Sequence, residues 1–458
     1  MLVLRLLRSC GKNFSRFPEP IDLVVRSLRT ADMAGWLSGS VWQFMAVTKK
    51  SDLHTDTPLW SATPRISPRS HNRPIKSTYD VVIVGAGISG ALMASALVDG
   101  ARKVLVIDRR KPVGGSSLAS TAMIQHEIDV PLSTLVEKVG ERKAKRVWSR
   151  SMESVDKLAE RVRAAGIRCG FERKQTLFLT GDEMGWRALK AEAELRAASG
   201  FEAAFLDGPT LRDSYGLDRT GAVLTNCSAS ANPAQMTAGF LRQAVRNGAE
   251  LACDIEVTDV ACNEGEVTLT LSSGAQVTAG NVVFCTGYEF LKRLAHLDHD
   301  VISTWAIATK PDVKRPEWLD RFLIWEASDP YLYLRTTRDG RIVAGGEDEA
   351  DEKAHLDRKK LRRKADMIAK KVGDLLGQDP VQIDYCWAGP FGVTPDGLPI
   401  IGEVPGLAGV FTVMGFGGNG ITFSQIASEI IAARIAGHVD PDEGLFAVRS
   451  HGAARHVA

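Results

Sequence analysis

Long apolar runs, paired cysteines and a strong excess of one charge are all missing from this sequence. No window approaches the roughly 18 consecutive apolar residues of a membrane-spanning helix, so we expect no stable insertion into a membrane. The seven cysteines are odd in number and scattered, with no CxxC spacing, which argues against a disulfide framework or a metal site. The net charge is only +2 at pH 7, so the chain has no general attraction for nucleic acid.

The small positive excess is concentrated near the N-terminus. Residues 1–76 carry 12 Lys and Arg against 5 Asp and Glu, which leaves the remainder mildly acidic and without the basic stripe that nucleic-acid binding needs. Prolines recur from Pro58 to Pro74, which predicts a flexible, extended arm over residues 1–76 instead of a packed element. The basic residues 1–30 fit either a cytoplasmic protein with a dispensable leader over residues 1–45, or an organellar presequence.

The first strong structural signal begins at Tyr79. Residues 79–84 form a continuous apolar, β-branched run of strand length, as in a strand buried on both faces of a parallel sheet. Glycines follow at once, residues 88–98 have helical apolar spacing, and residues 103–107 have a second strand pattern. The segment therefore predicts a strand, a turn, a helix and a second strand within about 30 residues.

The turn in this unit, residues 85–90, reads GAGISG, which is a GxGxxG motif in the context that makes it specific. Gly85 permits the tight turn, Gly87 lets the backbone approach a pyrophosphate, and Gly90 lets the helix pack closely on the strand. The helix N-terminus offers N–H groups and a positive dipole end to the phosphates. Asp108, at the end of the second strand, is expected to accept hydrogen bonds from an adenosine ribose.

The rest of the chain mixes helical and strand patterns. Amphipathic helices are predicted at residues 134–166, 182–198 and 232–247. Strand patterns occur at 251–260, 266–272 and 277–285, and alternation typical of an antiparallel sheet occurs at 301–310, 322–326, 331–336 and 341–345, with a hairpin turn at Asp339-Gly340. At 458 residues, two joined lobes are expected. The predicted fold class is α/β (α+β overall), with a parallel nucleotide-binding lobe interleaved with an antiparallel lobe.

Three further segments favour FAD over NAD as the dinucleotide. The paired Gly114-Gly115 follows Asp108 and is followed by small hydroxyl residues. Residues 282–287 (VVFCTG) form a buried strand that ends in small residues. Residues 415–422 (GFGGNGIT) open an apolar helix, and a glycine-rich turn at a helix N-terminus suits negative charge. That turn would face the N1–C2=O edge of the isoalloxazine, which becomes anionic on reduction.

In this combination of motifs the chain resembles the D-amino-acid oxidase family of FAD-dependent oxidoreductases, in the branch with glycine, sarcosine and γ-glutamylputrescine oxidases. The resemblance covers about residues 78–440. It implies a Rossmann-like FAD-binding domain made of residues 77–125, 221–290 and 386–440. It also implies a substrate lobe made of residues 126–220 and 291–385, with an antiparallel sheet over the flavin, and it leaves residues 441–458 as a tail.

The resemblance also assigns the residues around the cofactor. No cysteine or histidine stands where relatives attach flavin covalently, so FAD is expected to be noncovalent. The predicted cofactor-binding residues are Gly85, Gly87, Ile88, Ser89, Gly90, Asp108, Arg109, Gly115, Ser116, Ser117, Ser120, Thr121, Val257, Cys285, Thr286, Gly287, Gly417, Gly418, Asn419, Gly420, Ile421 and Thr422.

Two departures from the family bear on the substrate. Relatives that oxidise glycine hold the substrate carboxylate with an Arg after the Trp-Ala-Gly segment, and a second basic residue often precedes the last Asn-Gly. Here these places hold Phe391 and Gly418. Neither residue can replace the bidentate guanidinium fork that binds a carboxylate in a dry pocket. A simple α-amino acid is therefore a less expected substrate than an amine without that carboxylate.

Six residues are candidates for the substrate side of the flavin. The strands of the second lobe supply Trp305, Tyr331, Tyr333 and Arg335, which could shape an aromatic slot and bind an outlying anionic group. Gln125 and His126 stand where sarcosine-oxidase-like relatives carry basic residues. A plain core role for Trp305 and Tyr331, and a structural role for His126, are the alternatives. The acidic side chains of Glu326, Glu347 and Asp348 could instead attract a cationic amine.

The implied chemistry is oxidation of a C–N bond of a small amine or amino acid by hydride transfer to flavin N5, followed by hydrolysis of the imine. The hydride step needs no acid–base residue if the amine is bound neutral, and burial disfavours the charged form of an amine. Oxygen or an electron carrier would reoxidise the flavin. Two alternatives stay open: a carrier-linked D-amino-acid dehydrogenase, and a flavin-bearing subunit without turnover.

Overall fold

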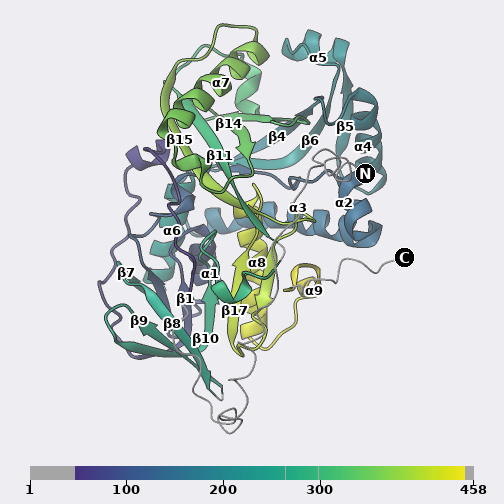
Figure 1. The fold of residues 1–458 in the computed structure, drawn as a ribbon. Coiled ribbons are helices and arrows are strands. Elements are labelled where there is room, and N and C mark those ends of the chain that lie inside the picture. Colours follow the sequence, from purple (N-terminus) through teal and green to yellow (C-terminus); the bar gives the residue numbers. More distant parts are fainter. Residues whose placement is uncertain (1–46, 264, 298, 449–458) are drawn as a thin grey trace, which may run out of the picture. The chain divides into compact units, whose positions relative to one another are not determined.

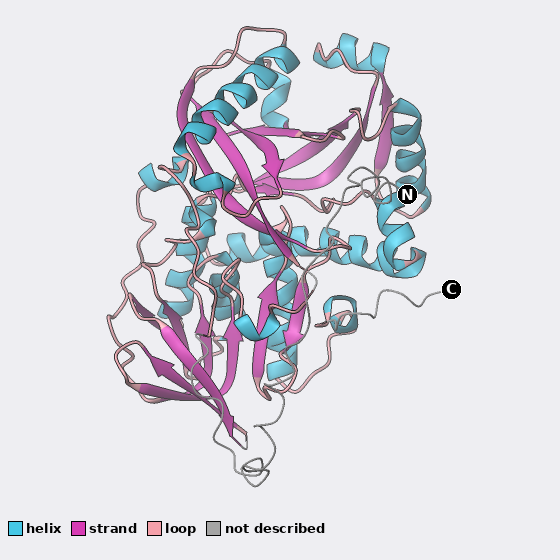
Figure 2. Ribbon diagram, in the orientation of Figure 1, coloured by secondary structure: helices cyan, strands magenta, loops and turns pink. Residues whose placement is uncertain are grey.

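The structure is a computed structural model that describes residues 47–263, 265–297 and 299–448. The predicted leader over residues 1–45 and most of the predicted tail lie outside the described residues. Two sheets, each with helices on it, make up the described part of the chain (Figures 1 and 2). Within that part, no helix is both long enough and apolar enough to span a membrane.

The first sheet has eight strands and a mainly parallel centre. Its main path runs β16-β17-β10-β1-β2-β7, with β8 and β9 joined as an antiparallel extension on β10. The pairs β17–β10, β10–β1, β1–β2 and β2–β7 are all parallel. The strands are β1 (Thr78–Val84), β2 (Val104–Asp108), β7 (Glu250–Cys253), β8 (Val257–Asn263), β9 (Glu266–Leu271), β10 (Gln276–Phe284), β16 (Ile400–Glu403) and β17 (Val410–Met414).

Both faces of this sheet are covered, which explains the continuous apolar run in β1. Val81 and Ile83 point into the core under the helices, while Val82 and Val84 point into a second core on the other face. The helices packed together on the first face are α1 (Ile88–Leu97), α6 (Pro233–Arg246) and α8 (Gly420–Ile435). The predicted strand–turn–helix–strand unit is confirmed.

The second sheet has nine strands in the order β15-β11-β14-β13-β12-β4-β6-β3, with β5 paired to β6. Its central pairs are antiparallel, apart from the parallel pair β12–β4. Its strands are β3 (Met123–Ile124), β4 (Glu172–Leu179), β5 (Ala203–Asp207), β6 (Gly221–Ser230), β11 (Asp300–Thr309), β12 (Phe322–Glu326), β13 (Leu332–Thr336), β14 (Ile342–Glu349) and β15 (Ile383–Val393).

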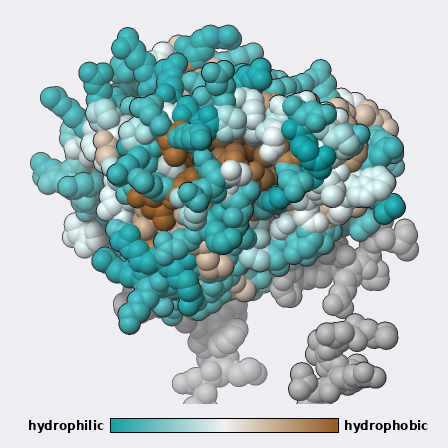
Figure 3. Space-filling model, turned by 90° about the horizontal axis from the view of Figure 1, so that it is seen from above, coloured by the Kyte–Doolittle hydropathy of each residue, from teal (hydrophilic) through white to brown (hydrophobic). Residues whose placement is uncertain are grey.

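Helix α7 (Arg358–Leu376) packs on one face of the second sheet. Leu332 and Leu334 of β13 point into that core, so the alternate residues Tyr331, Tyr333 and Arg335 point to the opposite face. Seen from above, this end of the molecule carries a band of hydrophobic residues among hydrophilic ones (Figure 3). The other helices are α2 (Leu132–Val139), α3 (Glu141–Ala164), α4 (Trp186–Ala198), α5 (Gly208–Tyr215) and α9 (Glu443–Phe446).

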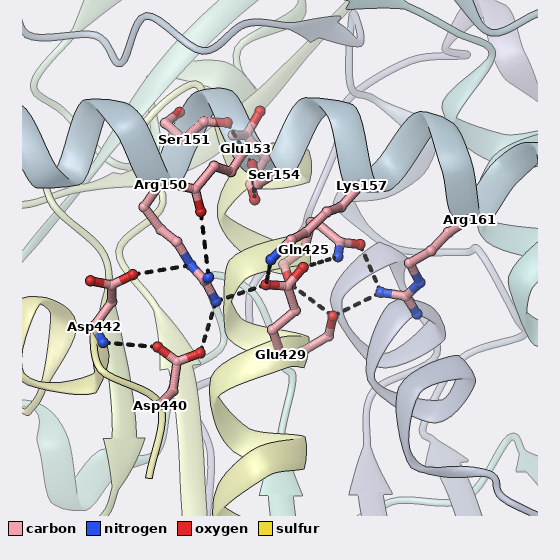
Figure 4. Close-up of polar contacts among 12 residues, drawn as sticks. Arg150, Ser151, Glu153, Ser154, Lys157, Arg161, Gln425, Glu429, Asp440 and Asp442 are labelled. Atoms are coloured by element: carbon pink, nitrogen blue, oxygen red, sulfur yellow. Dashed lines mark hydrogen bonds and ion pairs between the residues drawn. The ribbon is translucent and has the colours of Figure 1, made fainter.

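A cluster of ion pairs fixes α8 to α3 and to the segment after α8 (Figure 4). The guanidinium of Arg150 on α3 lies 2.7 Å from Glu429, 2.9 Å from Asp440 and 3.6 Å from Asp442. About three turns farther along α3, Arg161 donates hydrogen bonds to side chains of α8. Contacts from α3 thus fix helix α8 along its length and hold its N-terminus in position.

Several local expectations differ from the structure. The helix predicted over residues 134–166 breaks at Gly140, whose φ of +84° ends α2 before α3 begins. The strand predicted over residues 251–260 is divided at Asp254, where φ is +62°. The hairpin turn at Asp339-Gly340 is confirmed, with Gly340 at φ +76°.

Sheet membership also differs from the expected segment boundaries at two places. Strand β6 was placed with the cofactor domain, but it pairs with β3, β4 and β5 in the second sheet. Most of β15 was placed there as well, but it pairs with β11. Both strands end beside the first lobe, so their sequence neighbours gave no sign of which sheet their hydrogen bonds join.

The prediction of an unpacked arm was wrong for residues 47–76. Thr55 pairs with Ala388 of β15, and His71 pairs with Ala252 of β7. Leu53 and Trp60 are buried, and the Trp60 indole donates a hydrogen bond to the Ser120 carbonyl. The prolines exclude a regular helix or strand, but they do not prevent an extended segment from packing on the body.

Candidate cofactor and substrate site

A cavity lies between the two sheets and is lined by residues from both. Its wall includes the turn after β1, the segment after β2, the end of β10 and the start of α8. Part of the N-terminal segment also contributes, because Leu53 lines the cavity. The motifs that lie far apart in the sequence therefore meet at one place.

The three motif glycines are each required for a different reason. A Cβ atom on Gly90 would lie 1.8 Å from the Gly85 carbonyl oxygen, so only glycine lets α1 pack on the turn. Gly85 has a φ of +119°, and a Cβ there would lie 2.3 Å from the Cys285 oxygen. Gly87 differs, because its Cβ would meet only Ser117 Oγ, at 3.1 Å. The backbone of Gly87 is therefore accessible from the cavity.

Asp108 closes the same turn from the end of β2. Its carboxylate accepts hydrogen bonds from the backbone N–H groups of Ala86 at 2.6 Å and Arg110 at 2.7 Å. Burial raises the pKa of Asp108, and these two hydrogen bonds oppose the rise. Asp108 lines the cavity at the predicted place. The structure adds a role in holding the turn, which the motif did not indicate.

The two arginines that follow Asp108 share one acidic partner that sequence reasoning missed. Glu289 is buried, makes a short ion pair with Arg109, and accepts hydrogen bonds from Arg110 at 2.6 and 2.7 Å. Glu289 stands two residues after Gly287, so a search beyond the end of the VVFCTG run would have found it. Arg109 also lies 3.6 Å from Glu256, so two carboxylates face the two positive charges at this end of the cavity.

Two helix N-termini meet at the cavity. The hydroxyls of Ser89 on α1 and Ser424 on α8 lie 2.7 Å apart, which ties the two first turns together. Ser117 Oγ accepts a hydrogen bond from the Ile88 N–H at 2.8 Å. Ser116 Oγ is buried in the cavity wall and has no hydrogen-bond partner within the described residues. Helix N-termini, bare glycine backbone and a free hydroxyl are the groups that a dinucleotide needs.

Asp129 at the start of α8 was also missed. It accepts hydrogen bonds from the Gly418 N–H and from the Asn419 side-chain amide, the latter at 2.8 Å. Asp129 is exposed to the cavity that it lines. The surrounding protein raises its pKa, and the two N–H donors oppose this rise. An isolated aspartate in a loop carries no motif, so the sequence offered no signal for it.

Nearly all the predicted cofactor residues line this one cavity. Three do not: Gly90 acts inside the turn, Asn419 binds Asp129, and Thr422 donates to the Gln125 carbonyl at 2.9 Å. The predicted residues in the wall are Gly85, Gly87, Ile88, Ser89, Asp108, Arg109, Gly115, Ser116, Ser117, Ser120, Thr121, Val257, Cys285, Thr286, Gly287, Gly417, Gly418, Gly420 and Ile421.

The second sheet closes the other end of the cavity with aromatic and polar side chains. Tyr331, Tyr333, Phe391 and Gln125 line it, and the two tyrosine rings lie 5.9 Å apart between centroids. Trp305 contributes to the wall, but it is wholly buried in the core beneath α7, with Lys364 Nζ 5.0 Å from its ring. The Trp305 side chain is therefore a core residue, which was the alternative considered for it.

Two candidates for the substrate side lie elsewhere. The guanidinium of Arg335 is buried and donates to the carbonyls of Thr121, Thr336 and Ala231 at 2.7 to 3.0 Å. Burial lowers the pKa of Arg335 to about 10. Its side chain does not line this cavity, so its use as an anion anchor there was a wrong expectation. The resemblance placed Arg335 over the flavin, but in the structure its guanidinium is bound to three backbone carbonyls.

His126 is likewise a core residue. Its ring is buried and meets Trp148 edge-on at 5.8 Å, away from the cavity wall. Burial lowers its pKa, which favours the neutral ring. The structural reading of His126 is the one that the geometry supports, whereas its neighbour Gln125 faces the cavity.

Comparison with known proteins agrees with this arrangement. Residues 80–434 match the family model described as FAD dependent oxidoreductase (DAO). The chain belongs to this family. It is therefore an FAD-dependent enzyme, as the motifs predicted, and the cavity between the sheets has the groups to hold FAD.

The similar sequences are distant ones. A glycine oxidase from Bacillus licheniformis is 23% identical over 376 residues, which cover 80% of this chain and 95% of that protein. The mitochondrial sarcosine dehydrogenase of Mus musculus is 22% identical over 83% of this chain, but this covers only 42% of the mouse protein. A probable oxidoreductase, OrdL, from Haemophilus influenzae is 23% identical over 78% of this chain and 83% of its own length.

The fold is that of solved family members. The crystal structure of glycine oxidase from Geobacillus kaustophilus superposes with a TM-score of 0.69, covering 84% of this chain and 100% of that chain at 21% identity. L-proline dehydrogenase from P. horikoshii gives a TM-score of 0.65 at 20% identity, covering 81% of this chain and 96% of that chain. At such identities the likeness shows the fold, and the substrate must be argued from the residues of this chain.

Proposed function

We propose that this protein uses noncovalent FAD to oxidise the C–N bond of an amine whose reacting carbon carries no carboxylate. The observation that carries the proposal is the charge of the residues that close the substrate end of the cavity. Among the lining residues the only basic ones are Arg109 and Arg110, and both pair with Glu289 at the nucleotide end. No lining arginine or lysine comes from the second sheet.

The cofactor would be held by the first lobe. The turn at Gly85 and Gly87, the N-terminus of α1 and the hydroxyls of Ser116 and Ser117 suit its pyrophosphate. Bound FAD supplies an acceptor for the hydride that leaves the carbon next to nitrogen. The protein's own part is to bind the amine against the tyrosine wall and to exclude water from the site.

The aromatic end also suits an uncharged or cationic organic group better than an anion. Phe391 stands where the resemblance puts a carboxylate-binding arginine, and it lines the cavity. Arg335 was the other candidate for binding a carboxylate, but its guanidinium N–H groups donate hydrogen bonds to backbone carbonyls. An α-carboxylate placed here would lose its hydration without gaining a charged partner, which is unfavourable.

The test is the rate of anaerobic flavin reduction with matched pairs that differ only in the α-carboxylate. Ethylamine is compared with both enantiomers of alanine, and benzylamine with both enantiomers of phenylglycine. A charge-assisted anchor contributes on the order of 2 to 3 kcal/mol, so its absence removes about a 30- to 150-fold advantage of the amino acid. We expect the amines to reduce the flavin faster.

A variant pair sharpens this test. Phe391→Arg restores a guanidinium at the cavity wall and should move the preference toward the amino acids, whereas Phe391→Leu should not. A strong preference of the unmodified protein for the free α-carboxylate would contradict the proposal.

A further inference from the structure

A bulge in the second sheet places one carboxyl behind the tyrosine wall of the cavity. Strand β14 pairs Glu349 with Ser303 and Gly346 with Trp305 of β11, so β14 contains one more residue than β11 between these pairs. Glu347 in the bulge has a φ of +62°, an uncommon conformation for a residue with a side chain. A bulge re-aims the side chain that follows it. That side chain is Asp348.

The acidic residues on either side of Asp348 are neutralised from α7. Lys364 lies 3.3 Å from Glu347 and 3.2 Å from Glu349. Lys371 lies 2.5 Å from Glu347, and Lys360 lies 2.6 Å from Glu349. Among the described residues, no basic side chain forms an ion pair with Asp348, whose carboxylate instead accepts a hydrogen bond from Tyr331.

The hydrogen-bond partner of Asp348 is a tyrosine of the cavity wall. The Tyr331 hydroxyl donates to Asp348 Oδ2 at 2.8 Å, while Asp348 Oδ1 is buried without a hydrogen-bond partner in the described part of the chain. The Thr304 hydroxyl lies close enough to favour the ionised carboxyl, although it makes no hydrogen bond of good geometry. Because Tyr331 donates its proton to Asp348, its oxygen has only lone pairs left to offer.

The neighbouring Tyr333 lines the same cavity. The Tyr333 hydroxyl occupies space above Gly345, where a Cβ atom would lie only 2.2 Å from the phenol oxygen. Burial raises the pKa of Tyr331 well above its ordinary value, so this phenol keeps its proton throughout the working pH range. The Tyr331 oxygen and two aromatic ring faces, with the Asp348 carboxylate behind them, suit an ammonium group.

We propose that Asp348 is a positioning residue that acts through Tyr331 to bind the ammonium form of the substrate and to accept its proton. The inference rests on the proposed function and adds the charge state in which the amine arrives. In the step, the Tyr331 oxygen takes one N–H proton of the ammonium while its own proton moves to Asp348. The amine becomes neutral, the carboxylate becomes a carboxyl, and Tyr331 ends as the same neutral phenol.

The charges around Asp348 decide the pH at which this step operates. Burial raises the pKa of Asp348 to about 6, and the hydroxyls of Thr304 and Tyr331 oppose the rise, while Asp129 and Asp329 add to it. Glu347 and Glu349 are directed to the lysines of α7. An alkylamine has a pKa of about 10 and arrives protonated at neutral pH. Above about pH 6 the carboxyl is mostly ionised and can hold the cation.

The binding part is tested with a pair of equal shape and opposite charge that the enzyme cannot oxidise. tert-Butylammonium has no hydrogen on the carbon next to nitrogen, and pivalate replaces the ammonium by a carboxylate. Binding of each to the FAD-loaded protein is measured by the change in the visible flavin spectrum at pH 8. We expect tert-butylammonium to bind at least 10-fold more tightly than pivalate. Equal affinity, or no binding of the ammonium, would overturn the inference.

Matched variants assign the effect to Asp348. Asp348→Asn keeps the shape and can still accept from Tyr331, but it should weaken tert-butylammonium at least 10-fold. Asp329→Asn removes the same charge from an exposed neighbour that does not contact Tyr331, and it should change binding less than 3-fold. If Asp348→Asn does not retain FAD, Tyr331→Phe removes the link between the carboxyl and the cavity and should show the same loss. Equal losses in the Asp348 and Asp329 variants would show a general charge effect.

The proton-accepting part is tested by a pH profile. The apparent second-order rate of anaerobic reduction by an amine should rise as pH passes about 6 in the unmodified protein, and this rise should vanish in Asp348→Asn. An unchanged profile would refute the relay. If no amine reduces the flavin while tert-butylammonium still binds as expected, the proposed function fails and the ammonium site stands. If amines are oxidised but Asp348→Asn behaves as the unmodified protein, only the present inference fails.

Discussion

At the scale of single residues, Gly87 and Gly90 of the first turn have different roles: Gly90 is needed for folding, and Gly87 for cofactor binding. A side chain at Gly90 collides with backbone, whereas a side chain at Gly87 points into the cavity and meets only Ser117 Oγ. The motif assigns both residues to one fingerprint. The structure shows that they can be tested apart.

We expect Gly87→Val to fold but to lose FAD. The added methyl groups occupy the place where the backbone is bare, and they exclude a pyrophosphate. Gly90→Ala should instead lower soluble yield and thermal stability, because its Cβ would lie 1.8 Å from a carbonyl oxygen. The measurements are flavin absorbance per protein and circular dichroism. A yellow Gly87→Val protein with full FAD content would contradict this assignment.

The partners of individual side chains were harder to predict from the sequence than their positions. The resemblance to the family placed Tyr331 and Tyr333 over the flavin, and both tyrosines line the cavity. It also placed Arg335 there, and no local pattern indicates that the carbonyls of Thr121, Thr336 and Ala231 converge on its guanidinium. Partners that come from three segments are set by the tertiary fold, and spacing along one strand cannot predict them.

At the scale of elements, α8 brings its N-terminus to the cavity and depends on α3 behind it. The link is Arg150, which is almost wholly buried and lies among the carboxylates of Glu429, Asp440 and Asp442 (Figure 4). Lys157 on the same helix also pairs with Glu429, at 2.8 Å, but its side chain is 43% exposed. Burial decides which of the two ion pairs matters for stability.

Arg150→Ala should destabilise the protein by about 3 to 5 kcal/mol, because it removes the buried cation from three clustered carboxylates, of which Asp442 and Glu429 keep only the more exposed Arg146 and Lys157. Lys157→Ala should cost about 0 to 1 kcal/mol, since solvent already screens that pair. Chemical denaturation with intrinsic fluorescence measures both. Equal effects of the two substitutions would show that the cluster does not act through burial.

A helix or strand was predicted well where its sequence pattern depends only on neighbouring residues. The unit from β1 to β2 was predicted closely, because a buried parallel strand and a glycine turn leave strong patterns in a short segment. The bulge at Glu347 was missed, because it depends on how β14 pairs with β11 and not on the composition of β14. Residues 221–230 were assigned to the cofactor domain, and their pairing as β6 within the second sheet likewise leaves no local signal.

At the scale of the whole molecule, the segment over residues 47–63 belongs to the body of the enzyme. The Leu53 side chain lies 3.3 Å from the position of a Cβ on Gly115, beside the cavity, and its carbonyl oxygen lies 3.1 Å from that of Gly389. Thr55 extends the edge of β15. This segment therefore helps to close the site that the two sheets form.

A chain that begins at Met45 should keep its FAD content and soluble yield, whereas a chain that begins at Ile66 should lose FAD. The second deletion removes Leu53, Thr55 and Trp60, which leaves the cavity wall open and uncovers part of the core. Flavin absorbance per protein after gel filtration measures the difference. Full FAD content in the shorter chain would show that the segment only covers the body.

The order of strands in the first sheet has a consequence for synthesis on the ribosome. Strand β10 lies between β1 and β17. Strand β1, which is made early, therefore pairs with a strand from the middle of the chain, and β10 pairs in turn with β17, which is made near the end. Folding during translation usually proceeds from the N-terminus, domain by domain. Here β1 and β2 leave the ribosome more than half a chain before β17. The edge of β1 stays unpaired until β10 is made, and the edge of β10 stays unpaired until β17 is made. The nascent enzyme therefore depends on protection of these edges, and a flavin supplied during synthesis has no finished site to enter before the last strand arrives.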